Sequence, residues 1–429
     1  MEIPSVKVEH LYVHVPFCAA KCHYCAFYSE AGNAAKMEGY VDAVVAELEG
    51  FASQLEPKTI FFGGGTPSLL PALLMRRVLE GVAMKLNRGA PGGRALPTAP
   101  NSAVAPLEWT VECNPSTVTS EKAKLFREFG VNRISMGTQA LDDELLDIIG
   151  RIHSVKAAVE SYERLRAAGF DNINIDLMFG LPGQTMEHWR RTLQRVIDLQ
   201  PEHISTYCLI LEEDTHFWSL LQQGLIKPDE ELELAMYQTG METLATAGYR
   251  QYEISNFAKP GRECAHNIAY WEGKDYIGLG PSACSTVGAR RWQNAPDTDR
   301  YIAAMCGTNE PLVERDGRAR HPDEPLEGEV YPPKAAPEAT RAPAEPLKVD
   351  ERRAPIAYEE PITPELRAAE RAAFGMRMNA GVPAELVTGR WDKEIAELLS
   401  AELVQWRNGR LAPTPRGILF ADEVAAEFV

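Results

Sequence analysis

The sequence is poor in basic residues, in cysteine and in long apolar stretches. Its 429 residues include 44 Lys and Arg against 61 Asp and Glu, a net charge of −17, which disfavours nucleic acid as a partner. Eight cysteines are too few for a disulfide-rich scaffold. No apolar run reaches the roughly 18 residues that span a membrane, and residues 1–10 lack a signal-peptide pattern. We therefore expect a cytoplasmic protein whose clustered cysteines serve metal or redox chemistry.

The chain alternates between short apolar β-rich runs and segments of helical periodicity up to about residue 250. Six such units predict an α/β fold with a parallel sheet, either an open partial barrel or a doubly wound sheet. In both architectures, functional residues gather at the carboxyl ends of the strands. The expected strands are residues 11–16, 59–62, 109–113, 133–136, 172–178 and 203–210, and the expected helices are residues 36–54, 72–86, 120–128, 155–168, 186–199 and 230–247.

Two segments interrupt this alternation and divide the chain. Residues 88–106 are rich in Gly, Pro and Ala and predict an inserted surface loop. Residues 310–362 contain 10 prolines, 13 acidic and 8 basic residues, a composition that predicts a largely disordered linker. Helical periodicity returns at residue 363, and a turn at Asn408-Gly409 follows, which predicts a small winged-helix-like α+β domain. The expected division is a core at 1–306, a linker at 307–362 and a C-terminal domain at 363–429.

Three cysteines follow the first expected strand within one short loop. Cys18, Cys22 and Cys25 have the spacing C-x3-C-x2-C, and His23 between them is expected to point away. A tetrahedral zinc site would need a fourth ligand, and none lies at a familiar spacing. A thioredoxin-type pair of Cys22 and Cys25 would leave Cys18 unexplained. Three thiolates suit a [4Fe–4S] cluster that leaves one iron open to a small molecule.

Other strand ends carry polar groups suited to binding a ligand. The run GGGTP at residues 63–67 lets the backbone approach a ligand and offers N–H groups to a carboxylate, although a simple βα turn would have the same letters. Glu112 and Gln139 end the third and fourth expected strands. Asp176 lies in an apolar strand, where a carboxylate is costly unless it is paired, functional or solvated at the strand mouth.

The cysteine loop and the glycine run together resemble the radical S-adenosylmethionine (SAM) superfamily. There, C-x3-C-x2-C binds [4Fe–4S], SAM chelates the open iron, and an electron from the cluster cleaves SAM to a 5′-deoxyadenosyl radical. The resemblance implies a partial (β/α)6 radical-SAM barrel. From the residues alone, Arg151 would equally suit a surface salt bridge. The positions that the resemblance assigns to SAM contact are Tyr12, Tyr24, Gly64, Gly65, Thr66, Glu112, Gln139, Arg151 and Asp176.

Residues 11–18, LYVHVPFC, look like the opening of the oxygen-independent coproporphyrinogen III oxidase branch. The oxidase has a fourth cysteine two residues after the third, where this sequence has Phe27. The pattern C-x3-C-x2-C-x-F is that of the oxidase-like haem chaperones. This resemblance implies binding of haem, delivery to client haemoproteins that include membrane-associated ones, and an electron donor for the cluster. The alternatives are a coproporphyrinogen III dehydrogenase and a metal-stabilised binding protein without SAM chemistry.

A second motif supports the chaperone interpretation. Residues 266–271, HNIAYW, match the H-N-x-x-Y-W of these chaperones. The resemblance makes His266 the candidate haem-iron ligand, with Tyr270 and Trp271 offering flat faces to a porphyrin. A lone His beside aromatic residues is just as often part of a packed core. Cys264 and Cys284 are alternative soft ligands.

Overall fold

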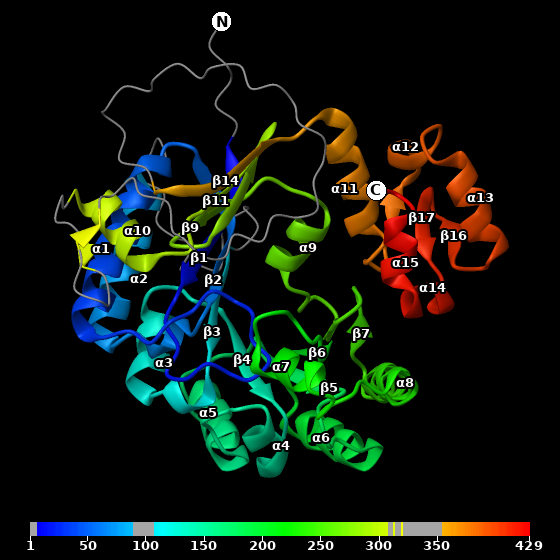
Figure 1. Ribbon diagram of the computed structural model, residues 1–429, viewed down its shortest axis with the longest axis horizontal. Coiled ribbons are helices and arrows are strands. Elements are labelled where there is room, and N and C mark those ends of the chain that lie inside the picture. The colour runs from blue at the N-terminus through cyan, green and yellow to red at the C-terminus, as the bar shows by residue number, and fades with distance from the viewer. Residues whose placement is uncertain (1–6, 89–106, 308–311, 314–318, 321–353) are drawn as a thin grey trace, which may run out of the picture.

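The computed structural model describes residues 7–88, 107–307, 312–313, 319–320 and 354–429. A nine-stranded sheet forms the centre of the molecule (Figure 1), in the order β7-β8-β6-β5-β4-β3-β2-β1-β9. Six of these strands are parallel and follow one another in chain order: β1 (Val8–Val15), β2 (Leu55–Gly64), β3 (Glu108–Cys113), β4 (Arg133–Gln139), β5 (Ile173–Phe179) and β6 (His203–Cys208). The predicted α/β fold with six parallel strands is therefore confirmed.

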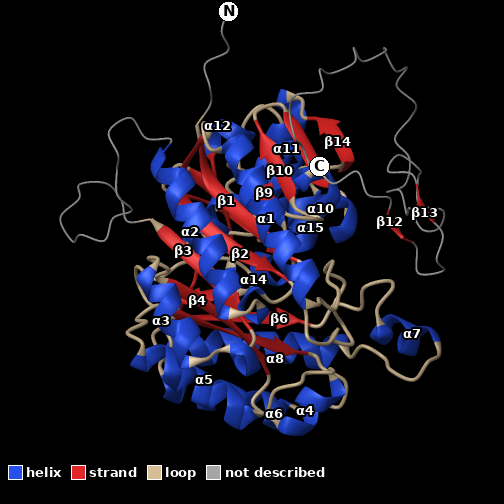
Figure 2. Ribbon diagram, turned by 90° about the vertical axis from the view of Figure 1, so that its left-hand side faces the viewer, coloured by secondary structure: helices blue, strands red, loops and turns tan. Residues whose placement is uncertain are grey.

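The strand order selects a partial barrel over a doubly wound sheet. A doubly wound sheet reverses direction at a switch point, whereas β1 to β6 are added one after another. Right-handed crossovers in one direction place the connecting helices on one face, outside the curved sheet (Figure 1). These helices are α1 (Ala34–Phe51), α2 (Ala72–Arg88), α3 (Ser120–Glu128), α4 (Asp143–Ile148), α5 (Val155–Ala167), α6 (Met186–Leu199) and α8 (Glu230–Thr246). The short helix α7 (His216–Gln222) stands apart from them (Figure 2) and lies against the cysteine loop, where the Phe217 N–H donates to the His23 carbonyl at 3.0 Å.

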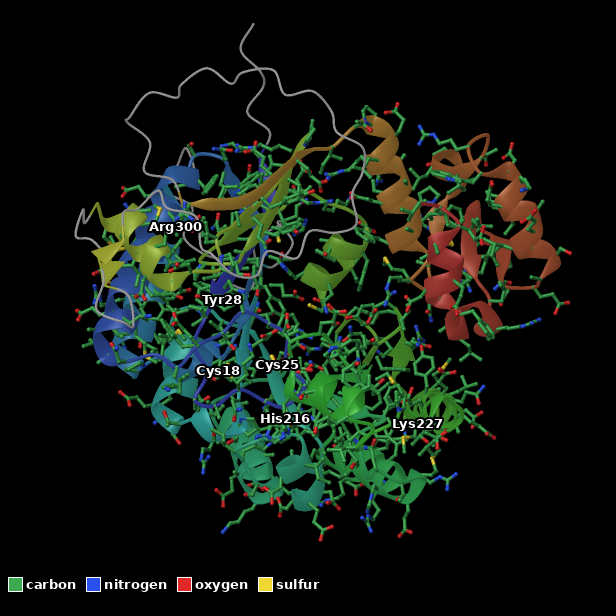
Figure 3. All side chains as sticks on the ribbon, in the orientation of Figure 1. Cys18, Cys25, Tyr28, His216, Lys227 and Arg300 are labelled. Atoms are coloured by element: carbon green, nitrogen blue, oxygen red, sulfur yellow. The ribbon has the colours of Figure 1, made fainter. Side chains whose placement is uncertain are left out.

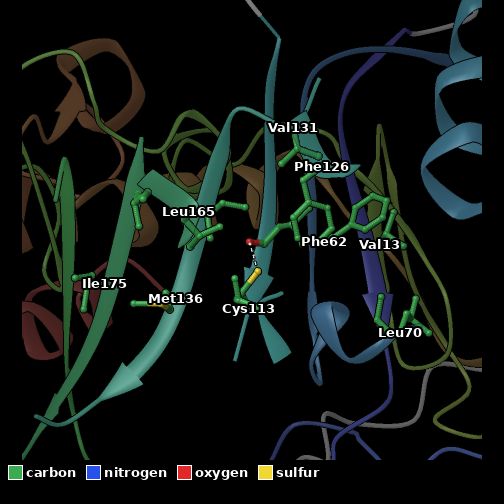
Figure 4. Packing of buried hydrophobic residues seen from close by; sticks show 14 of the residues in the cluster. Val13, Phe62, Leu70, Cys113, Phe126, Val131, Met136, Leu165 and Ile175 are labelled. Carbon is green, nitrogen blue, oxygen red and sulfur yellow. Dashed lines mark hydrogen bonds between the residues drawn. The ribbon is translucent and has the colours of Figure 1, made fainter. Parts of the chain in front are cut away.

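Side chains alternate along each strand between an apolar outer face and a polar inner face. On the outer face Phe62 and Met136 are buried against the helices together with Phe126 and Leu165 of α3 and α5 (Figure 4). The inner face carries polar residues in register, because Glu112 pairs with Ser135. The sheet therefore encloses a polar interior, which the sequence does not announce.

Beyond β6, the chain closes the two edges of the sheet. β8 (Asn256–Ala258) pairs antiparallel with β6, β7 (Arg250–Gln251) pairs with β8, and β9 (Ile277–Leu279) pairs parallel with β1. The short helix α9 (Ala265–Trp271) lies between these strands along the chain. Further elements are β10 (Cys284–Val287), β11 (Arg290–Asn294), α10 (Thr298–Cys306), β12 (Leu312–Val313) and β13 (Ala319–Arg320).

The predicted linker ends too late in the sequence. Its last part is the strand β14 (Ile356–Pro361), which pairs antiparallel with the edge of β11. The composition of residues 310–362 did not reveal this strand, because its partner comes from a segment more than 60 residues earlier. Residues 321–353 of the predicted linker, and 89–106 of the predicted insertion, lie outside the described residues; α2 continues through Arg88, the first residue of that insertion.

The C-terminal region combines short helices with a three-stranded antiparallel sheet. The strands have the order β15-β17-β16, and a hairpin turn joins β16 to β17 at the predicted site, with φ 51° at Asn408 and 73° at Gly409. The region has its own core around Met376, Leu411 and Phe428. Its elements are α11 (Pro364–Gly375), β15 (Val382–Pro383), α12 (Ala384–Val387), α13 (Asp392–Ser400), β16 (Val404–Arg407), β17 (Arg410–Pro413), α14 (Pro415–Leu419) and α15 (Ala421–Ala426).

Helix α11 attaches this region to the barrel (Figure 1). The Arg291 guanidinium on β11 donates two hydrogen bonds of 2.7 Å to the Glu370 carboxylate and one of 2.9 Å to Glu360. Phe374 of α11 stacks on Tyr270 of α9, with ring centroids 6.0 Å apart. Within the described ranges, no helix is long and apolar enough to cross a membrane.

We expect Arg291→Ala to weaken the attachment of α11. Both carboxylates would remain, half-buried and without their donor, which should lower the free energy of unfolding by about 1 to 3 kcal/mol. Denaturant unfolding measures the change. Lys393→Ala is the control, since Lys393 forms an exposed pair with Glu397. Equal unfolding midpoints for parent and Arg291→Ala would contradict this account of the junction.

Candidate cofactor-binding site

A cavity of about 420 Å³ opens at the carboxyl ends of the strands, beneath the cysteine loop. The barrel thus brings together residues from five strands and from the loops that follow them, as expected for this end of the sheet. Figure 3 labels Cys18 and Cys25 of the loop. Of the residues predicted for the site, the cavity is lined by Cys18, Cys22, Tyr24, Cys25, Gly64, Gly65, Thr66, Glu112, Gln139, Arg151 and Asp176.

Hydrogen bonds at its two ends close the cysteine loop. The Cys18 N–H donates to the Glu30 carbonyl at 3.0 Å, and the Glu30 N–H donates to the Pro16 carbonyl at 2.8 Å. In the middle of the loop, the ring Nδ1 of His23 lies 2.9 Å from the Ile148 carbonyl. His23 is therefore turned away from the cavity, as predicted, and anchors the loop to the last residue of α4.

The three thiols fit a cluster better than a single ion. Within the described part of the chain, no three His, Cys, Asp or Glu side chains converge on one ion position. A cubane needs its thiolates apart, because each binds a different iron at a different corner. The Cys18 sulfur lies 3.6 Å from the Thr66 hydroxyl, and the Arg151 guanidinium donates to the Cys22 sulfur at 3.4 Å.

Two further cysteines reach the same cavity from the strands. Cys113 ends β3 and Cys208 ends β6. Burial raises the pKa of each thiol to about 12. Both are therefore protonated at neutral pH and are poor competitors for iron.

Close packing explains the glycines of the GGGTP turn. Gly64 has φ 101°, and a methyl group there would lie 2.6 Å from the His14 ring. A methyl group on Gly65 would lie 2.8 Å from the carbonyl oxygen of Val15. Only glycine lets β1 and this turn approach so closely.

The expectation of free amides in this turn is wrong for Gly65 and Thr66. The Gly65 N–H donates to the Val15 carbonyl and the Thr66 N–H to the Phe17 carbonyl, both at 2.8 Å. Because these two amides already have acceptors, Gly65 offers a ligand space and Thr66 offers its hydroxyl.

The carboxylates of Glu112 and Asp176 repel each other inside the barrel. Asp176 accepts hydrogen bonds from Asn174 at 2.7 Å and Ser135 at 3.1 Å, so it is paired rather than freely solvated. Burial, and then repulsion from Asp176, raises the pKa of Glu112 to about 8. Burial also raises the pKa of Asp176. Two carboxylates held at raised pKa in a cavity are typical of a site that receives a cation or hydroxyl donors.

Gln139 and Arg151 complete the cavity wall. Gln139 has φ 68°, rare for a residue other than glycine, and the β4–β5 pairing shifts register between Gly137 and Gln139. Such strained backbone persists where the surrounding structure fixes it, often at functional sites. The Arg151 guanidinium donates to the Gly137 carbonyl as well as to Cys22. Arg151 is thus part of the site and does not form a surface salt bridge.

Tyr12 and His266 lie deeper in the barrel and do not line this cavity. The Tyr12 ring stacks on Phe61 with centroids 6.3 Å apart, and Phe61 stacks on His266 at 5.0 Å. The Nδ1 of His266 lies 2.8 Å from the Thr59 hydroxyl. Burial lowers the pKa of His266 to about 3, so the imidazole is neutral at physiological pH.

Glu108 fixes the start of the helix that carries the H-N-x-x-Y-W motif. Its carboxylate accepts the N–H groups of Ala265 at 2.9 Å and His266 at 3.0 Å, a favourable place for a negative charge. The Cys264 thiol donates to the same carboxylate at 3.4 Å and is fully buried. Cys264 is therefore inaccessible as the alternative haem ligand. Cys284 begins β10, where burial raises its pKa.

Sequence reasoning missed Arg133, the buried charge at the centre of the barrel. Its side chain is 1% exposed, and its Nε has no hydrogen-bond partner in the described chain. Its positive charge opposes the rise in the pKa of Glu112 and Asp176 and lowers the pKa of His266. The sequence signal for this buried charge was an Arg within the otherwise apolar strand expected at 133–136.

The sequence alone also did not predict the apolar residues at the mouth of the cavity. The mouth carries exposed apolar side chains from three separate loops: Phe27, 70% exposed, with Ile152 and Ile210. No sequence pattern links these residues, because only folding brings their loops together.

The comparisons with known proteins agree with this architecture. A family model of the Radical SAM superfamily matches residues 12–196. The solved structure of Escherichia coli coproporphyrinogen III oxidase (HemN), a radical SAM enzyme, superimposes with a TM-score of 0.72 over 99% of this chain and 90% of its own, at 22% sequence identity. The fold and the cavity therefore define a radical SAM protein, and this superfamily implies a [4Fe–4S] cluster and SAM.

Curated relatives define the family more narrowly. The heme chaperone HemW of Bacillus subtilis is 37% identical over 76% of this chain and 82% of its own length. The heme chaperone HemW of Escherichia coli is 38% identical over 65% of this chain and 70% of its own length. A mouse mitochondrial relative, radical S-adenosyl methionine domain-containing protein 1, is 37% identical over 64% of this chain and 59% of its own length. The chain belongs to the HemW family.

The raised pKa of Glu112 predicts that SAM binding strengthens with pH. Near pH 7 Glu112 is mostly protonated, and above pH 8 its carboxylate can accept hydroxyl donors and attract the sulfonium. We expect the Kd for SAM to fall about tenfold between pH 7 and 9, as measured by anaerobic calorimetry.

The variant Glu112→Gln should lose most of this dependence, while the exposed control Glu121→Gln should keep it. The amino group of SAM titrates in the same pH range whether the parent or a variant is measured. The difference between the variants therefore reports the contribution of Glu112 to the pH dependence. Identical pH profiles for parent and Glu112→Gln would refute the assignment.

Proposed function

We propose that this chain is a haem chaperone that carries a [4Fe–4S] cluster and binds SAM and haem. The observation that carries the proposal is the joint placement of the cysteine loop and the predicted SAM residues around one cavity, with Phe27 at its mouth. The relatives at 37% and 38% identity, both named heme chaperones, support the same function.

Cys18, Cys22 and Cys25 would hold the cluster, with Arg151 balancing thiolate charge at Cys22. When bound, the cluster supplies one-electron reduction of SAM. Around it, Gln139, Glu112 and Asp176 offer an amide and carboxylates to hydroxyl groups of the ligand. Thr66 contacts the cysteine loop at Cys18, and Tyr24 lies within the loop and keeps its proton because burial strongly raises its pKa.

Phe27 favours a chaperone over a decarboxylating dehydrogenase. It stands where the oxidase branch has a fourth cysteine, and its ring is largely exposed at the cavity mouth. The likeness to the solved oxidase extends to the fold alone at 22% identity. An electron donor would reduce the cluster, and client haemoproteins, membrane-associated ones included, would receive the haem.

His266 is the proposed haem-iron ligand. Its Nδ1 contacts Thr59, and its Nε2 has no hydrogen-bond partner among the residues described. A neutral imidazole with one nitrogen fixed by a hydrogen bond is the usual form of an iron ligand.

One anaerobic experiment separates chaperone from enzyme. We expect reconstituted protein to bind haem and to pass it to an apo-haemoprotein, followed by absorption spectra. We expect no protoporphyrinogen IX after incubation with coproporphyrinogen III, SAM and a reductant. Stoichiometric decarboxylation would overturn the proposal.

The cluster assignment makes a second prediction. Cys22→Ala should lose the EPR signal of the reduced [4Fe–4S] cluster, because two thiolates rarely hold a cubane. Cys306→Ala is the matched control, since Cys306 ends α10 and does not line the cavity. A full cluster signal in Cys22→Ala would show that other ligands bind it.

The haem assignment predicts a spectroscopic change without loss of the cluster. His266→Ala should shift or remove the Soret band and leave the cluster spectrum unchanged, because His266 lies outside the cluster cavity. Trp271→Ala should weaken haem retention and keep the ligation signature. An unaltered Soret band in His266→Ala would place the ligand elsewhere.

A further inference from the structure

A second pocket lies at the opposite end of β1 from the cysteine loop. It has a volume of about 300 Å³ and is bordered by five basic or potentially basic side chains: Lys7, His10, Lys274, Arg367 and Arg371. Two of them come from α11 of the C-terminal region, and the others come from β1, the residue just before it and the segment after α9. In a chain of net charge −17, such a concentration of basic groups is unexpected.

The acidic residues that border this pocket already have cationic partners. Glu9 pairs with Lys58 at 2.7 Å, Glu272 pairs with Lys274 at 3.5 Å, and Asp275 pairs with Arg367. Arg371 has no ion-pair partner among the residues that the structure describes. Within the same described ranges, the Lys7 ammonium donates to the Ser53 carbonyl and has no carboxylate partner. The pocket therefore keeps positive charge that an anion would balance.

Arg371 is seated beside the turn that follows α9. Its Cγ would lie 2.6 Å from a methyl group on Gly273, whose φ is 64°. Only glycine at this position lets the arginine stem lie across the turn. Arg371 thus lines the pocket, and its guanidinium, which has no ion-pair partner among the described residues, could bind a planar anion such as a carboxylate.

His10 connects this pocket to the proposed haem ligand. The His10 ring borders the pocket and lies 6.3 Å from the His266 ring, centroid to centroid. The Thr59 hydroxyl lies 2.9 Å from His10 Nδ1 and 2.8 Å from His266 Nδ1, so one hydroxyl joins both imidazoles. A molecule whose iron is bound at His266 would have its peripheral side chains within reach of the pocket.

We propose that this basic pocket is a carboxylate site and that it binds the propionates of haem. The inference rests on the proposed haem function. It adds the anion-recognising half of the haem site, with Arg371 and Lys7, which have no carboxylate partner among the described residues, as the charged contacts. Because β1 spans eight residues, roughly 25 Å, haem held here would lie away from the cluster cavity. Propionate recognition should therefore be independent of the cluster.

Haem dimethyl ester, which lacks the two negative charges, tests the proposal. Both haem and the ester are titrated into parent and Arg371→Gln, and the Soret band is followed. We expect Arg371→Gln to weaken haem binding about tenfold and to leave the weaker binding of the ester unchanged. Arg76→Gln is the control, since Arg76 pairs with Glu128 on the outside of the barrel. The same difference should persist in Cys22→Ala.

The outcomes distinguish this site from the proposed function. Equal affinities for haem and ester in the parent, or no effect of Arg371→Gln, would overturn the pocket assignment and leave the chaperone function standing. If the parent binds neither compound, both the pocket assignment and the proposed chaperone function are wrong. A pocket for a small free anion would instead bind inorganic phosphate in the parent and lose it in Arg371→Gln, with haem affinity unchanged, and that result also overturns the propionate assignment.

Discussion

The structure depends on a buried cation, Arg133, inside an otherwise acidic barrel. Glu108, Glu112 and Asp176 all project into the same enclosed interior, where unbalanced carboxylates would be expensive to ionise. The charge of Arg133 opposes the rise in the pKa of Glu112 and Asp176. Glu108 in turn holds the amino end of α9. One guanidinium thus lies between the cluster cavity and the helix that carries His266, and the charges of both regions act on it.

The two ends of the barrel are specialised for different chemistry. At the carboxyl ends of the strands, thiols, a strained Gln139 and a glycine turn surround the cofactor cavity. At the amino end, the start of β1, the turn after α9 and α11 border a basic pocket. The C-terminal region therefore does more than cover an edge of the sheet, because α11 supplies Arg367 and Arg371 to that pocket. This division is consistent with a protein that holds haem apart from its cluster.

The glycine turn shows how a correct motif can be assigned a wrong detail. The letters GGGTP identified the right turn and the right cavity. They could not reveal that the N–H groups of Gly65 and Thr66 donate to the carbonyls of Val15 and Phe17, at the end of β1 and just after it. Hydrogen-bond partners more than 40 residues away decide this. The linker prediction failed at Ile356–Pro361 for the same reason, since the edge of β11 determines that strand.

The sequence by itself determined the six β/α units, the cysteine loop and eleven of the thirteen predicted site residues that share one cavity. It could do so because strand periodicity is local, and parallel strands bring their carboxyl ends to one edge. Only the tertiary structure decided that Arg133 is buried, that Cys264 is closed off, that Tyr12 and His266 lie deeper, and that Arg371 reaches the turn after α9. Burial and charge balance are sums over neighbours distant in sequence, so no local pattern encodes them.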